Sequence, residues 1–167
     1  MQSDIRWLSF EQVAALHDLS IEKYGGAAGV KDESAVHSAI NAPQDRNYYT
    51  GEDNLLTLAV ILCERIAGNH GFSDGNKRTA LASMRMFLQL NYLDISEDLN
   101  GPSGFKDEDG REWTLLEKAV KDLTAHEIDA DAFQEFLEDH IVEIKEAEEG
   151  IEVEPTAGKI VDFRSII

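Results

Sequence analysis

The sequence predicts an almost all-α fold, organised as a single domain with at most a small β-hairpin flap and a short C-terminal tail. Apolar residues recur at helical spacing through most of the 167-residue chain, and residues that favour helix N-caps stand before several of these runs. Hydrophobic residues make up 43% of the chain and only three residues are proline, which excludes collagen-like and globally disordered classes. A chain of this length usually forms one domain.

The first predicted helix covers residues 10–24. Ser9 and Gln12 form a capping-box pattern at its start, and apolar residues follow at roughly helical spacing. Gly25 and Gly26 end the run.

A short second helix is expected to be capped by Asp32 and to stop before Pro43. Residues 44–53 contain aromatic residues and turn formers without a hydrophobic period. We therefore expect a loop or a small flap there.

Two buried helices are predicted in the middle of the chain. Residues 54–67 are apolar on nearly all sides, which is typical of a helix through the centre of a core. A polar, glycine-bearing loop at residues 70–75 follows, and the next helical run extends from Asn76 to Leu90. The loop is therefore expected to lie between two core helices.

Residues 100–113 hold three glycines and one proline, and they predict a connecting excursion with a hairpin turn at Asp109-Gly110. Thr114 and Glu117 then repeat the capping box and start a helix that reaches about residue 126.

Asp129 can cap the last predicted helix, whose apolar face includes Phe133 and continues to Ile144. The helical spacing of apolar residues ends after Gly150. We therefore predict a domain of residues 1–150, followed by a tail or one short strand at residues 151–167.

Composition limits the function. The formal net charge is −18, and so acidic a surface repels phosphate backbones, so no direct nucleic-acid binding is expected. The longest apolar stretch, Leu55 to Cys63, is far shorter than the roughly 20 residues needed to cross a bilayer, so no membrane association is expected. Cys63 is the only cysteine and no apolar signal segment stands near the N-terminus, which favours a cytoplasmic protein with Cys63 as a small buried hydrophobe.

The most informative segment runs from His70 to Arg78. It gathers a base, a carboxylate, a flexible glycine, an amide and two cations at the start of a helix. Helix N-termini carry unpaired N–H groups and a partial positive charge, which suit phosphate oxygens. Gly75 lets a ligand approach the backbone, and Lys77 and Arg78 add positive charge for a polyphosphate.

The other polar residues of this segment complete a site that handles phosphate. Asp74 can hold Mg²⁺, and Asn76 can bind the metal or a phosphate oxygen without adding negative charge. His70 can take a proton from a hydroxyl group near neutral pH.

Two other interpretations remain open from the residues alone. The segment could be a solvated helix start with local capping only. His70 and Asp74 could also belong to a hydrolytic metal site, although a catalytic zinc usually has three protein ligands and no second histidine or cysteine is close in the sequence. The other histidines lie on predicted helices without such neighbours, and we expect structural or solvent-exposed roles for His17, His37, His126 and His140.

The segment resembles the signature of the Fic/Doc family, His-x-Phe-x-(Asp/Glu)-(Gly/Ala)-Asn-(Gly/Lys)-Arg. It matches the death-on-curing (Doc) branch, in which a lysine, here Lys77, replaces the second glycine. The similarity covers roughly residues 8–145 and includes Leu16-His17, Tyr24-Gly25-Gly26, Ala39-Ile40-x-x-Pro43 and Arg78-Thr79-Ala80-Leu81.

This resemblance implies a role for each residue of the segment. His70 would be the base that activates a target hydroxyl, and Asp74 would bind Mg²⁺. Phe72 would anchor the loop in the core. The anion hole for ATP would be formed by Gly75, Asn76, Lys77 and Arg78.

Lys77 in particular implies a toxin-like protein kinase, similar to Doc, that transfers the γ-phosphate of ATP to a threonine of a translation factor such as elongation factor Tu. The chain lacks the inhibitory-helix pattern of some members, so restraint is expected from a separate antitoxin. Transfer of AMP to a protein hydroxyl remains an alternative, because members with glycine at this position resemble AMP transferases. A non-catalytic interaction module also remains, because Gly68 stands where the family often has a basic residue; Arg65, one helical turn earlier, is a candidate to replace it.

Overall fold

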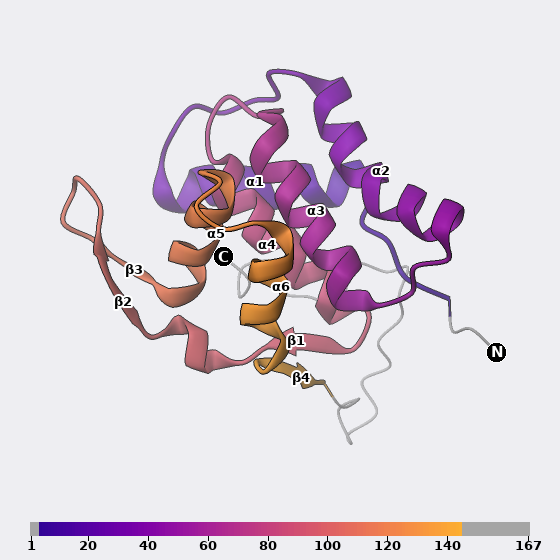
Figure 1. The fold of residues 1–167 in the computed structure, drawn as a ribbon. Coiled ribbons are helices and arrows are strands. Elements are labelled where there is room, and N and C mark those ends of the chain that lie inside the picture. The colour runs from indigo at the N-terminus through magenta and orange to yellow at the C-terminus, as the bar shows by residue number, and fades with distance from the viewer. Residues whose placement is uncertain (1–3, 145–167) are drawn as a thin grey trace, which may run out of the picture.

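The computed structural model describes residues 4–144, which form mostly helices and two small antiparallel sheets (Figure 1). The helices are α1 Phe10–Tyr24, α2 Glu33–Thr50, α3 Leu55–Asn69, α4 Asn76–Leu90, α5 Leu115–Thr124 and α6 Ala130–Glu138, with a 3₁₀ helix η1 at Glu97–Asn100. The strands are β1 Leu93–Ile95, β2 Pro102–Lys106, β3 Glu112–Thr114 and β4 Ile141–Glu143. The prediction of a mainly helical fold with small β elements is confirmed.

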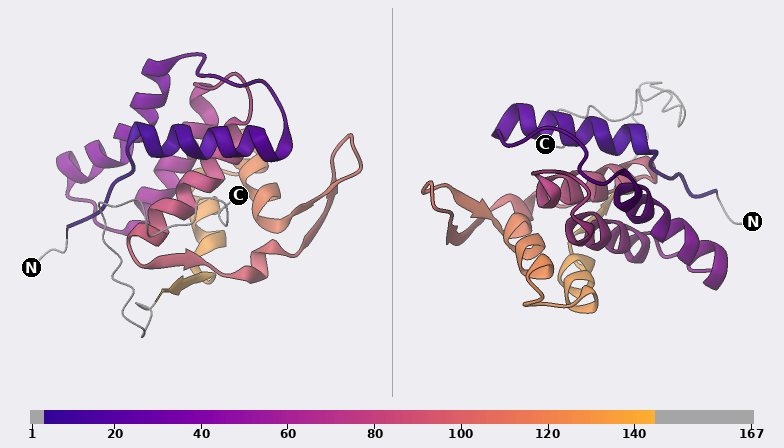
Figure 2. Two further views of the ribbon diagram at one scale, coloured as in Figure 1. Left: turned by 180° about the vertical axis from the view of Figure 1, so that it is seen from behind. Right: turned by 90° about the horizontal axis from the view of Figure 1, so that it is seen from above.

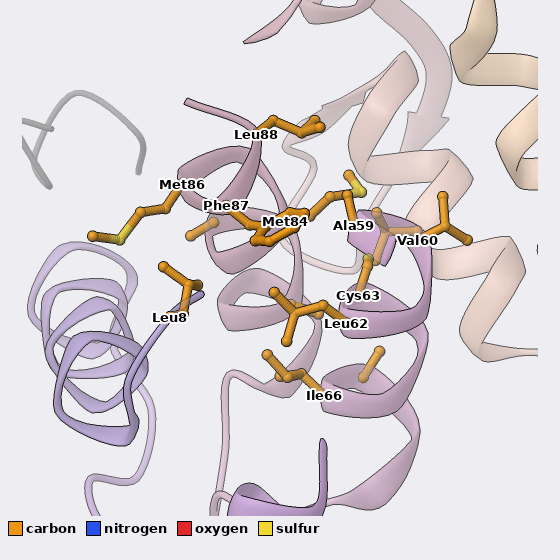
Figure 3. Close-up of a cluster of buried hydrophobic side chains, with 14 of the residues drawn as sticks. Leu8, Ala59, Val60, Leu62, Cys63, Ile66, Met84, Met86, Phe87 and Leu88 are labelled. Atoms are coloured by element: carbon orange, nitrogen blue, oxygen red, sulfur yellow. The ribbon is translucent and has the colours of Figure 1, made fainter. Parts of the chain in front are cut away.

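The α3–α4 pair forms the centre of the fold. Figure 2 shows α1 on one side of this pair and α5 and α6 on the other, and contacts of α1 with α4 and of α6 with α3 agree with that arrangement. In Figure 3 the side chains of both central helices, among them Leu62, Cys63, Met84 and Phe87, gather in one buried cluster. The loop between α3 and α4 therefore connects two helices that are closely packed in the core.

Cys63 has no exposed surface, as expected of a small buried hydrophobe. Burial, with a smaller contribution from Glu64, raises the pKa of its thiol to about 12. The thiol therefore stays neutral and unreactive near neutral pH.

Side-chain caps set the starts of nearly all helices in the described part of the chain. The residue before the helix accepts a hydrogen bond from the third backbone N–H of the helix in α1, α2, α3, α5 and α6, where the caps are Ser9, Asp32, Asn54, Thr114 and Asp129. Both predicted capping boxes, at Ser9 and at Thr114, are present. Helix α4 differs, because its cap is Gly75 and no side chain caps it.

Helix α2 is longer than the sequence predicts. It continues through Pro43 to Thr50, so the prediction of a stop before Pro43 and of a loop or flap at residues 44–53 is wrong. Proline inside a helix removes one backbone hydrogen bond and costs about 3 kcal/mol. Here Pro43 is itself buried, one turn beyond Ala39 on the face that packs on the core, and this packing offsets the lost bond.

The last predicted helix is shorter than expected. Helix α6 ends at Glu138, and residues 141–143 form β4, which pairs antiparallel with β1; the prediction of a helix as far as Ile144 is therefore wrong. The N–H of Ile144 donates to the carbonyl of Tyr92 at 2.9 Å, beyond the end of the paired residues. His126 and His140 likewise lie just past the ends of α5 and α6 rather than within helices.

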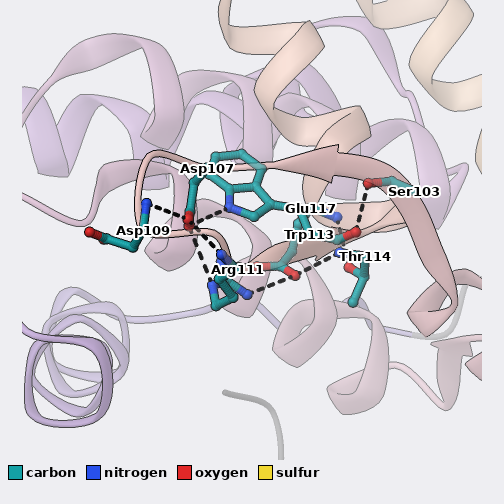
Figure 4. A network of polar contacts seen from close by, with 7 residues as sticks. All are labelled: Ser103, Asp107, Asp109, Arg111, Trp113, Thr114 and Glu117. Carbon is teal, nitrogen blue, oxygen red and sulfur yellow. Dashed lines mark hydrogen bonds and ion pairs between the residues drawn. The ribbon is translucent and has the colours of Figure 1, made fainter.

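The excursion predicted at residues 100–113 is a hairpin of β2 and β3 that projects from the helices (Figure 1). Its turn is closed by hydrogen bonds from Gly110 to Asp107 and from Asp107 to Arg111, which confirms the turn predicted at Asp109-Gly110. A polar network attaches the hairpin to α5 (Figure 4). In it, Arg111 donates to Glu117 at 2.9 Å, and the Trp113 indole donates to Asp107 at 3.0 Å.

We expect Glu117→Gln to reduce the loss of stability in acid. Burial raises the pKa of the Glu117 carboxyl, but hydrogen bonds from Arg111 and Thr114 outweigh burial and hold the pKa below its usual value. A carboxyl with a lowered pKa in the folded state stabilises the fold above its unfolded pKa, and this stabilisation disappears as the pH falls through the folded pKa. Urea unfolding should therefore show a steeper decline for the parent than for the variant between about pH 5 and about pH 3.

The control for this experiment is Glu108→Gln, because Glu108 is an exposed carboxylate at the tip of the same hairpin. It should keep the parental slope. Equal slopes for the parent and Glu117→Gln would show that the Glu117 carboxylate does not stabilise the fold in this pH range.

The predicted tail at residues 151–167, and the end of the predicted domain at residue 150, lie outside the described residues. Within residues 4–144, no helix combines the length and the hydrophobicity needed to span a membrane.

Candidate active site

One cleft contains every predicted site residue. It has a volume of about 780 Å³ and lies between the start of α4 on one side and the β2–β3 hairpin with α5 on the other. This volume falls in the range of small-molecule sites. The predicted residues that line it are His70, Asp74, Gly75, Asn76, Lys77 and Arg78.

His70 lies where α3 ends. Its backbone adopts the left-handed conformation, with φ of 52° and ψ of 42°, and its side chain is exposed to the cleft. Within residues 4–144 the ring has no hydrogen-bond or ion-pair partner. Its nitrogens are therefore available to a ligand.

The start of α4 forms an anion-binding wall of the cleft. The N-cap Gly75 has φ of 75°, and the first hydrogen bond of the helix runs from the N–H of Thr79 to the carbonyl of Gly75. Because glycine offers no capping side chain, the N–H groups of the first turn keep their hydrogen-bonding capacity for an anion.

Cations concentrate in this cleft although the chain as a whole has a net charge of −18. Of the fifteen lysine and arginine residues in the sequence, five line the cleft: Lys23, Lys77, Arg78, Arg85 and Arg111. Lys77 is exposed and has no ion-pair partner within the described part of the chain. Arg78 donates to the carbonyl of Gly25 at 3.3 Å, and its guanidinium lies 5.2 Å from the centre of the Tyr24 ring. Four carboxylates also line the cleft, Asp74, Asp107, Asp109 and Glu117, so its lining has a small excess of cations although the protein as a whole is acidic.

Backbone groups orient the Asp74 carboxylate. Its Oδ1 accepts the N–H of Gly75 at 2.8 Å, and its Oδ2 accepts the N–H of Ala27 at 3.4 Å. Each oxygen keeps a further lone pair, which suits Mg²⁺, because this ion is usually held by one or two carboxylates together with substrate phosphates and water. Among residues 4–144, no three histidine, cysteine or acidic side chains are placed to hold a metal. The zinc alternative, which needs three protein ligands, therefore does not fit.

Asn76 holds the loop together. Its Oδ1 accepts the N–H of Phe72 at 3.1 Å, and its Nδ2 donates to the carbonyl of Phe72 at 3.0 Å. Each end of the amide makes one hydrogen bond to Phe72, and the second N–H of Nδ2 and the backbone N–H of Asn76 are left for an anion. The Phe72 side chain is buried, in line with the anchoring role that the resemblance implies.

Comparisons with known proteins agree with these observations. The model of the Fic/DOC family matches residues 7–88. The chain is 35% identical over 91 residues to the "Protein kinase doc" of Escherichia phage P1, covering 54% of this chain and 72% of that protein. It is 32% identical over 111 residues to the "Toxin Doc" of Mycolicibacterium smegmatis, covering 65% of this chain and 78% of that protein. The chain belongs to the Fic/Doc family.

The Fic/Doc match extends from α1 to α4 and ends before the hairpin. One wall of the cleft thus comes from the part of the chain that the family model matches, and the other comes from residues beyond it. Arg111 connects the two walls, since its guanidinium lies 5.8 Å from the centre of the Tyr24 ring while its ion pair with Glu117 holds it to α5.

Sequence reasoning missed two residues that shape this Fic/Doc site. Tyr24 belongs to a segment that resembles the family, and this was the available signal, although it gave Tyr24 no role. Arg111 gave no local signal, because its contacts with Tyr24 and Glu117 depend on how the hairpin folds back.

Proposed function

We propose that this protein is the toxin of a toxin–antitoxin system and that it transfers the γ-phosphate of ATP to a hydroxyl group of a cytoplasmic protein. The observation that carries this proposal is the start of α4, which has no side-chain cap, carries Lys77 in its first turn and lines the same cleft as His70. A base and an anion-binding helix terminus in one cleft are what transfer of a phosphoryl group to a hydroxyl requires.

Each residue has a defined task in this reaction. The N–H groups of the first turn of α4, with Lys77 and Arg78, bind and align the phosphates. His70 takes the proton of the acceptor hydroxyl as its oxygen bonds to the γ-phosphorus, while the bond from that phosphorus to the bridging oxygen breaks and ADP leaves. Asp74 would hold Mg²⁺, which supplies neutralising charge for the phosphates when it is bound.

The names of the relatives support both parts of this proposal. One of them carries the name of a protein kinase and the other the name of a toxin. Lys77 is the residue that the resemblance associates with the kinase branch. By the same resemblance, we propose a threonine of a translation factor such as elongation factor Tu as the acceptor, and a separate antitoxin as the partner.

Labelled ATP tests this proposal. The purified chain is incubated with Mg²⁺, candidate translation factors and ATP labelled at either the α- or the γ-phosphate. Transfer of the γ-label alone supports the kinase. Transfer of the α-label shows AMP transfer instead, and no transfer to any candidate favours a non-catalytic interaction module.

One observation keeps the interaction module as a second candidate. Gly68 has no side chain to offer a phosphate, and Arg65, the candidate to replace a basic residue there, does not line the cleft. Neither position 68 nor Arg65 therefore supplies a cation for phosphate binding, which would depend on the start of α4 and on the cations that line the cleft.

Gly26→Ala is expected to lower phosphate transfer by about ten- to a hundredfold, because it would displace Asp74. A Cβ at position 26 would lie 2.5 Å from Oδ2 of Asp74, and the φ of 113° disfavours any side chain. Gly29→Ala is the matched control, since Gly29 has a similar φ of 102° but nothing within 4 Å of its added Cβ. Rates and melting temperatures of both variants separate displacement of Asp74 from backbone strain; equal losses in the two would contradict this explanation.

A further inference from the structure

A buried histidine packs against the loop at residues 70–75 and takes no part in the chemistry described so far. His17 is on α1, is only 1% exposed and does not line the cleft. Its ring stacks on the Phe72 ring with 4.0 Å between centres and 11° between planes. Its Nε2 lies 2.8 Å from the carbonyl oxygen of Asp74. A single side chain thus contacts the loop at two points.

The contact with Asp74 fixes which nitrogen carries a hydrogen. A carbonyl oxygen only accepts hydrogen bonds, so Nε2 of His17 must be the donor. The other nitrogen, Nδ1, lies 3.8 Å from Oδ1 of the exposed Asp18, too far for a hydrogen bond. The ring therefore has one strong polar contact, and it is with the loop.

That contact sets the direction of one peptide plane. The carbonyl of Asp74 and the N–H of Gly75 belong to the same planar group and point in opposite directions. His17 binds the carbonyl, and the N–H donates to Oδ1 of the Asp74 side chain at 2.8 Å. Fixing the carbonyl therefore fixes the N–H that orients the carboxylate.

The peptide plane between Asp74 and Gly75 directly precedes the start of α4. Gly75, the next residue, takes the left-handed conformation from which α4 begins, and Cδ2 of His17 lies 3.7 Å from the position of a Cβ on Gly75. A rotation of this plane would therefore move both the carboxylate and the first N–H groups of α4.

We propose that His17 is a positioning residue whose Nε2–H, by holding the carbonyl of Asp74, aligns the Asp74 carboxylate and the start of α4 for phosphate transfer. This inference rests on the proposed function for its kinetic test. Its structural content, a hydrogen on Nε2 that is bonded to the loop, does not depend on that function.

Two substitutions separate the hydrogen bond from the packing. His17→Phe keeps an aromatic ring against Phe72 but removes the donor, whereas His17→Gln keeps an N–H donor but loses the ring. We expect His17→Phe to lower kcat about ten- to a hundredfold with the KM for ATP changed less than about threefold, because misalignment acts on the reacting geometry. His17→Gln should recover most of kcat even if its melting temperature is the lower of the two.

The opposite order would overturn the proposal. If His17→Phe retains the parental kcat, or if both variants lose kcat equally while folded, the hydrogen bond does not position the site. Circular dichroism and thermal unfolding establish that each variant is folded when its rate is measured.

A spectroscopic measurement keeps the inference testable if the parent transfers no phosphate or if His17→Phe does not fold. Long-range ¹H–¹⁵N correlation spectra of the parent identify the protonated ring nitrogen of His17, which is assigned by the signals missing from His17→Gln. A proton on Nε2 supports the inference, and a ring with its only proton on Nδ1 overturns it. An inactive parent with a proton on Nε2 would count against the proposed function alone.

Discussion

His70→Ala is expected to abolish label transfer and to leave the fold nearly intact. The ring is exposed, lines the cleft and has no hydrogen-bond partner in the described residues, so its removal breaks no contact that the core needs. A general base contributes about 10²–10⁴ to the rate, which would bring transfer close to the background. The measurement is the initial rate of γ-label transfer, together with the melting temperature.

His126→Ala is the matched control for this substitution. His126 follows α5 with φ of 60°, as His70 follows α3 with φ of 52°, but His126 does not line the cleft. Both variants therefore place alanine in a left-handed conformation, and only one removes the base. Parental activity in His70→Ala, or an equal loss in both variants, would remove His70 from the mechanism.

The same pair of variants tests the toxin proposal in cells. Expression of the parent should stop growth, because modification of an abundant translation factor halts protein synthesis. His70→Ala should relieve this effect, and His126→Ala should not. Toxicity that survives in His70→Ala would separate growth arrest from phosphate transfer.

Elements defined by local pattern were predicted well. The capping box of Ser9 and Gln12 located the start of α1, and the run from Asn76 to Leu90 coincides with α4. These predictions held because caps and helical periodicity involve residues within one or two turns of each other. The loop that carries the motif was placed correctly for the same reason, since α3 is strongly apolar and α4 has buried apolar residues at helical spacing.

Elements that depend on distant partners were not predicted. Pro43 lies within α2 because one face of that helix is buried, and local rules for proline contain no information on burial. Residues 141–143 form a strand because β1 is available to pair with them. Pattern alone cannot distinguish a strand of three residues from the end of an amphipathic helix.

The candidate site shows the same division. The sequence identified the residues of the motif because they are contiguous. It could not reveal that α4 lacks a side-chain cap, that Asn76 closes the loop on Phe72, or that the hairpin supplies the opposite wall of the cleft. The wall of the cleft arises where segments far apart in the chain meet, whereas the cap and the Asn76–Phe72 contacts are local and depend on the conformation of the loop.

Lys77→Gly is expected to cut γ-phosphate transfer by about 10²-fold, far more than it weakens ATP binding. Lys77 is exposed in the first turn of α4 and lines the cleft, where under the proposed function its ammonium and the uncapped N–H groups would contact the same phosphates. A loose phosphoryl group depends almost wholly on alignment and electrostatics in the transition state, so a positioned cation acts mainly on kcat. Initial rates with labelled ATP and calorimetric binding of ATP measure the two effects separately.

Lys77→Ala is the control for Lys77→Gly. It separates the effect of losing the ammonium from the effects of the extra space and backbone freedom that glycine adds. Glycine near a helix start costs up to about 1 kcal/mol relative to alanine, so a loss shared by both variants is due to the ammonium. Glycine alone also opens room for the α-phosphate, and a trace of nucleotidyl transfer is expected only in Lys77→Gly. Mass spectrometry of the target separates the products, because a phosphoryl group and a whole nucleotide add different masses. If Lys77→Gly phosphorylates at the parental rate, position 77 does not select the phosphate. If the parent already adds a nucleotide, AMP transfer becomes the better description of this cleft.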